Sequence, residues 1–241
     1  MTACGPEDPR PALLPLFAVE ACRRLDVIDA GLTAERRDYR SLIREAHTVR
    51  GSAAVLGLEQ VAEEAERLED AFARARSDPG DLDADEAQLA VRRIRTLLAA
   101  VRAPAEEPGE DDAPAATPPA RLVLCVEDSA VNARLVERIL EAQGDAVVAA
   151  GSGQDACRLA VERRPDVVLL DLHLPDMSGE EVVRRLAARS ETRDVPIVVM
   201  TGGADQGRFE ALLALGVRGV LEKPYAPPEL VAALDAALAP S

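Results

Sequence analysis

The chain has 241 residues, enough for one large or two ordinary domains, and 48% of them are hydrophobic, which is sufficient for packed cores. Aromatic residues make up only 2% and tryptophan is absent, so these cores must be built mainly from Ala, Leu and Val. The formal net charge of -15, without a basic tract, argues against nucleic acid or an anionic membrane as the main partner. The chain begins without a basic leader, so we expect a soluble, cytoplasmic protein with no membrane insertion.

Apolar residues recur at helical spacing throughout the first 103 residues. Their stripes run over residues 14–32, 42–56, 61–75 and 87–101, and turn-forming segments separate them. Four amphipathic helices with short connections predict an antiparallel four-helix bundle over residues 1–103.

The second of these helices contains the segment AHTVRGSAAVLG, residues 46–57. At about 100° per residue, His47 lies about 140° from the centre of the apolar stripe, so we expect its ring to face water. Arg50 and Gly51 follow one turn later, near the same face. A glycine inside a helix costs about 1 kcal/mol relative to alanine, and clearance for a partner's active site over the ring would justify that cost.

This segment resembles the histidine phosphotransfer (HPt) domain, whose motif is a histidine, a basic residue three positions later, Gly-Ser, and a glycine ten positions after the histidine. The matching residues are His47, Arg50, Gly51, Ser52 and Gly57. The resemblance implies that a ring nitrogen of His47 receives and releases a phosphoryl group. Arg50, where the family usually has lysine, would steady the added negative charge, with Gly51 and Ser52 supporting the phosphorylated ring. For His47 alone, the alternative interpretation is a solvated helix histidine.

The composition changes after the fourth stripe. Residues 104–119 combine proline, alanine and acidic residues without apolar periodicity, which is typical of an extended linker between domains. Over residues 120–241, short apolar runs then alternate with helical segments, and this alternation predicts an α/β domain with a doubly wound, five-stranded parallel sheet. The runs cover residues 122–126, 146–150, 166–172, 196–201 and 216–221. The helical segments open near Ala130, Gln154, Gly179, Asp205 and Pro227.

Polar side chains mark the ends of these predicted strands. They are Glu127 and Asp128 after the first strand, Asp171 in the third, Thr201 in the fourth and Lys223 after the fifth. Ligands of parallel sheets bind at the carboxyl ends of the strands, so these groups should converge. Converging carboxylates repel each other unless a cation joins them, and oxygen ligands suit Mg²⁺. Asp171 can then form an acyl phosphate while Thr201 and Lys223 share the transferred charge.

This second pattern resembles the receiver domain of two-component response regulators, which has a flavodoxin-like fold. The resemblance covers residues 120–241 and rests on Glu127, Asp128, Asp171, Thr201, Lys223 and Pro224. It implies that Asp171 accepts the phosphoryl group and that Thr201 and Lys223 contact it. The implied Mg²⁺ ligands are Glu127, Asp128, Asp171 and the backbone carbonyl of His173.

Two further positions bear on the receiver resemblance. Lys223 is the only lysine in the chain, whereas the other 27 of its 28 basic side chains are arginine. A site that needs a slim ammonium on one phosphoryl oxygen explains why arginine does not replace it. Val220 stands where receivers usually carry an aromatic residue that changes rotamer on phosphorylation, which puts that switch in question, although Tyr225 lies nearby.

No nucleotide-binding kinase region and no DNA-binding module accompany these motifs. We interpret the chain as a phosphorelay intermediate that carries phosphoryl groups on His47 and Asp171. Its expected partners are a sensor histidine kinase or hybrid kinase and other receiver or HPt proteins, and it would be an enzyme only in its Mg-dependent self-phosphorylation and autodephosphorylation at Asp171. The alternative is a receiver that acts as a phosphorylation-dependent binding switch or phosphate sink, while the bundle mainly mediates association.

Overall fold

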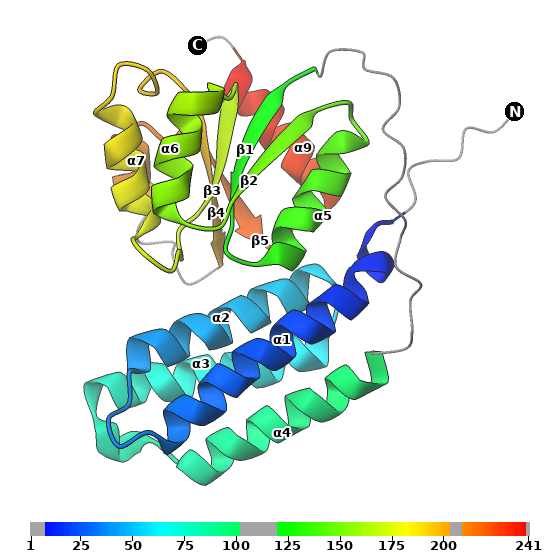
Figure 1. Cartoon of the computed structure of the whole chain (residues 1–241), viewed down its shortest axis with the longest axis vertical. Helices are drawn as coiled ribbons and strands as arrows, with labels where there is room; N and C mark the ends of the chain where they lie inside the picture. Colours follow the sequence, from blue (N-terminus) through cyan, green and yellow to red (C-terminus); the bar gives the residue numbers. More distant parts are fainter. Residues whose placement is uncertain (1–7, 102–119, 203–208, 240–241) are drawn as a thin grey trace, which may run out of the picture. The chain divides into compact units, whose positions relative to one another are not determined.

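The computed structural model describes residues 8–101, 120–202 and 209–239. Within these ranges the chain divides into two compact units, one made of helices and one built around a sheet (Figure 1). The predicted linker and the predicted helix start near Asp205 lie outside the described residues. Over the described part of the chain, no helix combines the length and the apolar character that crossing a membrane requires.

The N-terminal unit is the predicted four-helix bundle. Contacts join α1 to α2, α2 to α3, α3 to α4 and α4 back to α1, so the helices close into a ring. Two of the chain's three phenylalanines, Phe17 and Phe72, are buried inside it and supply bulk to a core otherwise made of aliphatic residues. The elements are α1 (Arg10–Thr33), α2 (Tyr39–Val55), α3 (Glu59–Ser77), the short 3-10 helix η1 (Pro79–Asp81) and α4 (Ala84–Val101).

Both ends of α2 are capped. At its start, the Asp38 carboxylate accepts hydrogen bonds from two backbone N–H groups of the first turn, at 3.1 and 3.3 Å. At its end, Gly57 has a φ of 76°, and the N–H groups of Gly57 and Leu58 bond back to carbonyls of the last turn. The glycine ten positions after His47 therefore terminates the helix that carries the histidine.

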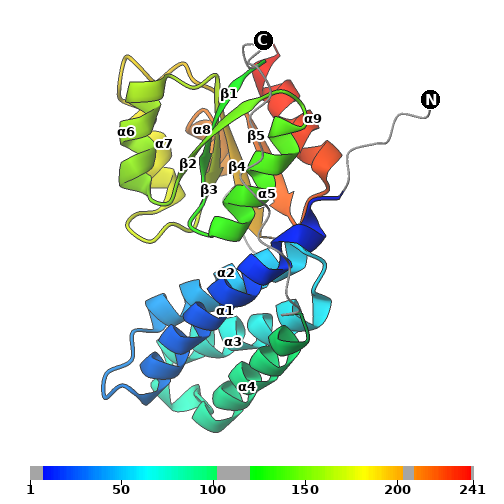
Figure 2. The same ribbon diagram turned by 45° about the vertical axis from the view of Figure 1, so that its right-hand side comes forward.

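The C-terminal unit is the predicted doubly wound, five-stranded parallel sheet, with strand order β2-β1-β3-β4-β5. Helices α5 and α9 cover one face, and α6 and α7 cover the other (Figures 1 and 2). The strands are β1 (Leu122–Val126), β2 (Ala146–Ala150), β3 (Val167–Asp171), β4 (Ile197–Gly202) and β5 (Gly219–Lys223). The helices are α5 (Ala130–Glu141), α6 (Gly153–Arg163), α7 (Gly179–Ala187), α8 (Phe209–Ala214) and α9 (Pro227–Leu238).

The central strand carries the predicted acceptor. Every residue of β3 is buried, and it pairs with β1 on one side and β4 on the other. Asp171 is its last residue, so its backbone is fixed by the most enclosed strand of the sheet.

The fifth strand begins later than the sequence pattern predicted. The expected run started at residue 216, but β5 begins at Gly219. Gly216 has a φ of 90°, and its N–H bonds back to the last turn of α8. The chain is therefore still leaving the helix at residues 216–218, and Lys223 becomes the last residue of the strand.

Candidate functional site

His47 on α2 lies against Glu69 on α3. Its Nδ1 is 2.9 Å from Glu69 Oε1. Only 13% of the histidine side chain is exposed, which corrects the expectation that the ring faces water. The helical angle does turn His47 away from the bundle centre, but α3 packs on that side of α2 and covers one edge of the imidazole.

This contact selects one tautomer of the ring. A carboxylate oxygen only accepts, so Nδ1 donates its proton to Glu69 and Nε2 carries the lone pair. Arg50 Nη2 also lies 3.3 Å from Nδ1, but a guanidinium only donates and would require the opposite tautomer. The shorter, charge-assisted contact with Glu69 favours Nδ1–H, which leaves Nε2 as the nucleophilic nitrogen.

Arg50 is held by acidic residues of α3. Its Nε lies 3.2 Å from Glu69 Oε2, and its Nη1 lies 3.4 Å from Glu66 Oε1. Glu69 therefore touches both the histidine and the arginine of the predicted motif. Glu69 could not be predicted from the sequence, because helical periodicity does not fix the register of α3 against α2.

Gly51 and Ser52, the other predicted supports of the ring, lie in different surroundings. A Cβ built on Gly51 would have no neighbour within 4 Å, so the protein itself does not need a glycine there. Ser52 is only 2% exposed and belongs to the inward side of α2, about 140° round the helix from His47. Ser52 therefore packs inside the bundle, whereas Gly51 adds no side chain to the surface beside His47.

A Gly51→Ala variant should separate stability from phosphoryl transfer. Alanine raises helix propensity without a clash, so the free energy of unfolding of the bundle should rise by about 1 kcal/mol in urea denaturation. The added methyl group should nevertheless slow phosphoryl transfer to His47 by about tenfold, because it holds a partner's acceptor away from the ring. Thr96→Ala, at an exposed position of α4, is the matched control and should gain helix propensity without losing transfer. A Gly51→Ala chain that transfers at the wild-type rate would show that clearance is not the function of this glycine.

The receiver residues converge around Lys223. Its Nζ lies 2.6 Å from Glu127 Oε2 and 2.6 Å from Asp171 Oδ2. The side chains of all three residues are at most 8% exposed. The converging carboxylates were expected to need a cation. For Glu127 and Asp171, the ammonium of Lys223 is such a cation.

The two carboxylates differ in their affinity for a proton. Burial raises the pKa of Glu127 to about 7, although Lys223 opposes that shift. Burial pushes the pKa of Asp171 upward as well, but attraction to Lys223 and hydrogen bonds from Lys223 and the His173 N–H hold it below its usual value. The pKa of Lys223 is raised well above its usual value, because attraction to Asp171 and Glu127 outweighs its own burial. Asp171 is thus the carboxylate that stays ionised, as a nucleophile must.

The remaining predicted receiver residues lie along the same edge of the sheet. Thr201 is opposite Glu222 in the β4–β5 register, one position before the partner of Lys223. Asp128 follows Glu127 and is half-buried. The backbone N–H of His173 donates to Asp171 Oδ1 at 2.9 Å, while its ring Nδ1 is 3.9 Å from that oxygen. Among the described residues, no group of three or more His, Cys, Asp and Glu side chains is arranged to hold a metal ion.

The aromatic residue near this edge is Tyr225, not residue 220. Val220 is half-buried and packs against the core of the sheet. Tyr225 is buried, and its hydroxyl donates to Met200 Sδ at 3.5 Å. A response to phosphorylation that used Tyr225 would therefore start from a side chain that is already enclosed.

The loop after Asp171 is tied down at two points. The Asp176 carboxylate accepts hydrogen bonds from the N–H groups of Gly153 and Gln154 at the start of α6, at 2.8 and 2.9 Å. At the start of α7, a Cβ on Gly179 would lie 2.8 Å from Leu172 Cα and 3.0 Å from the Asp171 carbonyl oxygen. The acceptor strand and α7 can approach this closely only because residue 179 is glycine.

A Gly179→Ala variant should therefore destabilise the receiver by about 1–3 kcal/mol, since its neighbours at closest approach include backbone atoms that cannot rotate away. The change should appear as a lower urea midpoint in circular dichroism and as slower phosphorylation of Asp171. Gly151→Ala is the matched control in the same unit, because a Cβ there has no neighbour within 4 Å. Equal stability of the two variants would contradict the close-approach argument.

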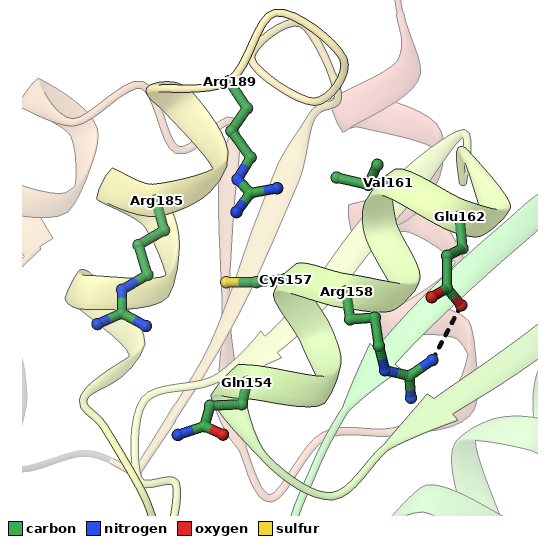
Figure 3. A pocket seen from close by; sticks show the side chains of 7 residues that line it. All are labelled: Gln154, Cys157, Arg158, Val161, Glu162, Arg185 and Arg189. Atoms are coloured by element: carbon green, nitrogen blue, oxygen red, sulfur yellow. Dashed lines mark hydrogen bonds and ion pairs between the residues drawn. The ribbon is translucent and has the colours of Figure 1, made fainter.

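A separate hollow of about 390 Å³ lies between α6 and α7 (Figure 3). Its walls carry three arginines and the buried Cys157, and Arg158 pairs there with Glu162 at 2.9 Å. None of the residues that line it is a predicted site residue. This hollow is therefore not the phosphoacceptor site.

Comparisons with known proteins agree with both units. Residues 12–104 match the family described as Hpt domain, and residues 123–235 match the response regulator receiver domain. The polar-differentiation response regulator DivK of Brucella anthropi is 34% identical over 109 residues, which are 45% of this chain and 89% of that protein.

Solved receiver structures are also similar to the C-terminal unit. Chemotaxis protein CheY4 of Vibrio cholerae shares 31% identity, with a TM-score of 0.47, over 48% of this chain and 98% of that one. The receiver domain of sensor histidine kinase PA1611 from Pseudomonas aeruginosa, solved with a magnesium ion in its active site cleft, shares 34% identity, with a TM-score of 0.46, over 49% of this chain and 97% of that one. The two family matches, in this order, and the identity to DivK show that the chain belongs to the two-component phosphorelay proteins, with an Hpt domain followed by a response regulator receiver domain.

Proposed function

We propose that this protein is a phosphorelay intermediate that carries a phosphoryl group on Nε2 of His47 and on a carboxylate oxygen of Asp171. The proposal rests on one observation: the chain holds two nucleophiles, and neighbouring side chains keep each of them in a reactive state. The imidazole is oriented through Nδ1 by Glu69, and the aspartate is kept ionised beside Lys223. We assign residues 1–103 to the Hpt bundle, 104–119 to the linker and 120–241 to the receiver.

The step at the receiver is an in-line displacement. An oxygen of Asp171 attacks the phosphorus of a phosphohistidine or of a small acyl phosphate, the bond to the leaving nitrogen or oxygen breaks, and an aspartyl phosphate forms. Lys223 compensates the negative charge on the transferred group, and the Thr201 hydroxyl donates to one of its oxygens. Hydrolysis of the same acyl phosphate by water would return Asp171 to its starting state.

The acidic edge of the sheet suits Mg²⁺ in its chemistry. Mg²⁺ keeps several water molecules and is bound by carboxylates together with phosphate oxygens, so a closed cage of side chains is not required. We propose Glu127, Asp128 and Asp171, with the carbonyl of His173, as its ligands. When bound, the ion would compensate charge on the phosphoryl oxygens.

At the bundle, the lone pair on Nε2 of His47 attacks the phosphorus of a partner's phosphohistidine or aspartyl phosphate, and the bond from phosphorus to the leaving nitrogen or oxygen breaks. Nδ1–H stays bonded to Glu69 during this step. The imidazolium that forms is stabilised by that carboxylate, and Arg50 faces the negative charge of the new phosphoryl group. The phosphoryl donors and acceptors would be a sensor or hybrid histidine kinase and other receiver or Hpt proteins. We place this exchange in the cytoplasm and expect no nucleic-acid partner.

Two full-length variants with one acceptor each test the relay. His47→Gln chains are phosphorylated on Asp171 with radiolabelled acetyl phosphate and Mg²⁺, and the remaining donor is then removed. They are mixed with Asp171→Asn chains, which are made distinguishable from them by length. Alkali-stable label on the Asp171→Asn chain would identify phosphohistidine at His47 and support transfer between the two acceptors. If the first chain charges but the second stays unlabelled, the acceptors serve different partners. A binding switch or phosphate sink at Asp171 would then be the better account of the receiver.

A further inference from the structure

We propose that the hollow between α6 and α7 is a binding site for a nucleoside phosphate (Figure 3). Its volume of about 390 Å³ lies within the range of small-molecule sites. Side chains of α6 form one wall, and two arginines at the end of α7, Arg185 and Arg189, form the other. Neither His47 nor Asp171 lines the hollow, so this inference does not rest on the proposed relay.

The two arginines of the α7 wall can still bind an anion. Arg185 contacts Glu181 through Nε at 2.8 Å, which leaves both of its terminal nitrogens without a partner in the described ranges. Arg189 forms no ion pair with any carboxylate that the structure describes. The two residues lie four positions apart, so their like charges repel until an anion lies between them. Guanidinium groups bind phosphate through paired N–H donors, which makes phosphate the favoured anion here.

Arg158 on the α6 wall offers a different surface. Its Nη2 lies 2.9 Å from Asp155 Oδ1, and its Nη1 lies 2.9 Å from Glu162 Oε2. Two carboxylates of its own helix therefore occupy the terminal nitrogens and compensate the charge. What remains for a ligand is the flat face of the guanidinium, on which planar rings stack. This wall therefore suits the base of a nucleotide better than its phosphate.

The floor of the hollow is apolar. Cys157 is only 8% exposed, its sulfur is turned toward the arginine pair, and the half-buried Val161 follows one turn later (Figure 3). Burial raises the pKa of the Cys157 thiol, so the sulfur is neutral at pH 7 and does not compete with an anion. Gln154, at the start of α6, adds an amide that can both donate to and accept from a base edge. A planar, partly apolar ring with a phosphate attached matches all of these groups.

The positive wall is a local exception in an acidic protein. The chain has a formal net charge of -15, which repels anions at long range. A phosphate ligand must therefore be held by direct contacts in the hollow and not by the overall field. We expect inorganic phosphate, which cannot contact the base wall, to bind poorly.

Isothermal titration calorimetry of the full-length chain without Mg²⁺ tests the site. The probes are adenosine 5′-monophosphate and guanosine 5′-monophosphate. At least one of them should bind, and its nucleoside and inorganic phosphate should each bind at least about tenfold more weakly, because each lacks one of the two sets of contacts.

Arginine variants locate the bound nucleotide. Arg189→Gln should weaken its binding at least about tenfold, since a charged phosphate partner is lost. Arg158→Lys keeps the charge but loses the flat face, so it should weaken nucleotide binding and leave phosphate binding unchanged. Arg193→Gln is the matched control, because this arginine is 62% exposed, lies outside the hollow and removes the same charge. Its affinity should stay within about threefold of the wild-type value.

Three results would overturn the inference. The first is the absence of binding heat with both nucleotides at millimolar concentration. The second is nucleotide binding that Arg189→Gln and Arg193→Gln weaken equally or not at all, since the ligand would then lie elsewhere or respond only to overall charge. The third is inorganic phosphate that binds as tightly as the nucleotide, which would make the hollow an anion site suited to a phosphorylated protein surface. Phosphoryl transfer between His47 and Asp171 would stand in all three cases.

Discussion

An Asp171→Asn variant of the full chain is expected to take up no phosphoryl group at the receiver from radiolabelled acetyl phosphate and Mg²⁺, a loss of at least about a thousandfold in rate. The amide has nearly the same shape as the carboxylate, so the fold should persist. What disappears is the ionised oxygen that attacks phosphorus. The variant also leaves Lys223 with Glu127 as its remaining carboxylate partner within the part of the chain that the structure describes.

The matched control is Asp176→Asn, five residues further along the same loop. Its carboxylate accepts two backbone hydrogen bonds at the start of α6, and the oxygen of asparagine can still accept one. This variant should be phosphorylated within about threefold of the wild-type rate, since the lost interaction holds the loop and not the reacting atoms. If Asp171→Asn chains acquire alkali-labile label at the wild-type rate, the phosphoacceptor is a carboxylate other than that of Asp171.

The sequence is informative about the inner strands of the sheet because β1, β3 and β4 are buried over almost their whole length. The run over residues 166–172 has no alternation to misread, and β3 occupies residues 167–171 of it. Once the strands are parallel, their carboxyl ends share one edge, and Asp171 and Lys223 could be brought together without any knowledge of side-chain conformations. The start of β5 was misplaced because an apolar run around Gly216 does not reveal where the last turn of α8 ends.

Contacts between elements could not be predicted from the sequence. The apolar stripe of α2 correctly turned His47 away from the bundle core, but it contained no information about what α3 places on that side. Glu69 looks like any other solvent-facing acid on an acidic helix. The 2.9 Å contact depends on how far α3 slides along α2, which side-chain packing in the core decides. The bridge from Lys223 to Glu127 was missed for a related reason, because two strands separate these residues in the sheet.

A Glu69→Ala variant should slow phosphoryl transfer to His47 by about 10–100-fold, the range typical for loss of the hydrogen-bond partner of a metal-ligating histidine. Without Glu69, the nearest described donor to Nδ1 is Arg50 Nη2, at 3.3 Å. Donation from Arg50 would place the ring proton on Nε2 and remove the lone pair that attacks phosphorus. The rate is measured in a single turnover, from phosphorylated His47→Gln chains to Asp171→Asn chains with and without Glu69→Ala.

A merely structural effect would lower the rate without changing the ring, so nitrogen-15 NMR of His47 is the second readout. It should show the proton mainly on Nδ1 in the parent chain and shifted toward Nε2 in Glu69→Ala. Glu69→Gln should retain most of the rate, because its side-chain oxygen can still accept from Nδ1–H. Glu66→Ala is the matched control on the same helix, since Glu66 is 58% exposed and contacts Arg50 at 3.4 Å. If Glu66→Ala and Glu69→Ala slow transfer equally and leave the tautomer unchanged, the two glutamates act through their charge on Arg50. The proposal that Glu69 orients the ring of His47 would then be wrong.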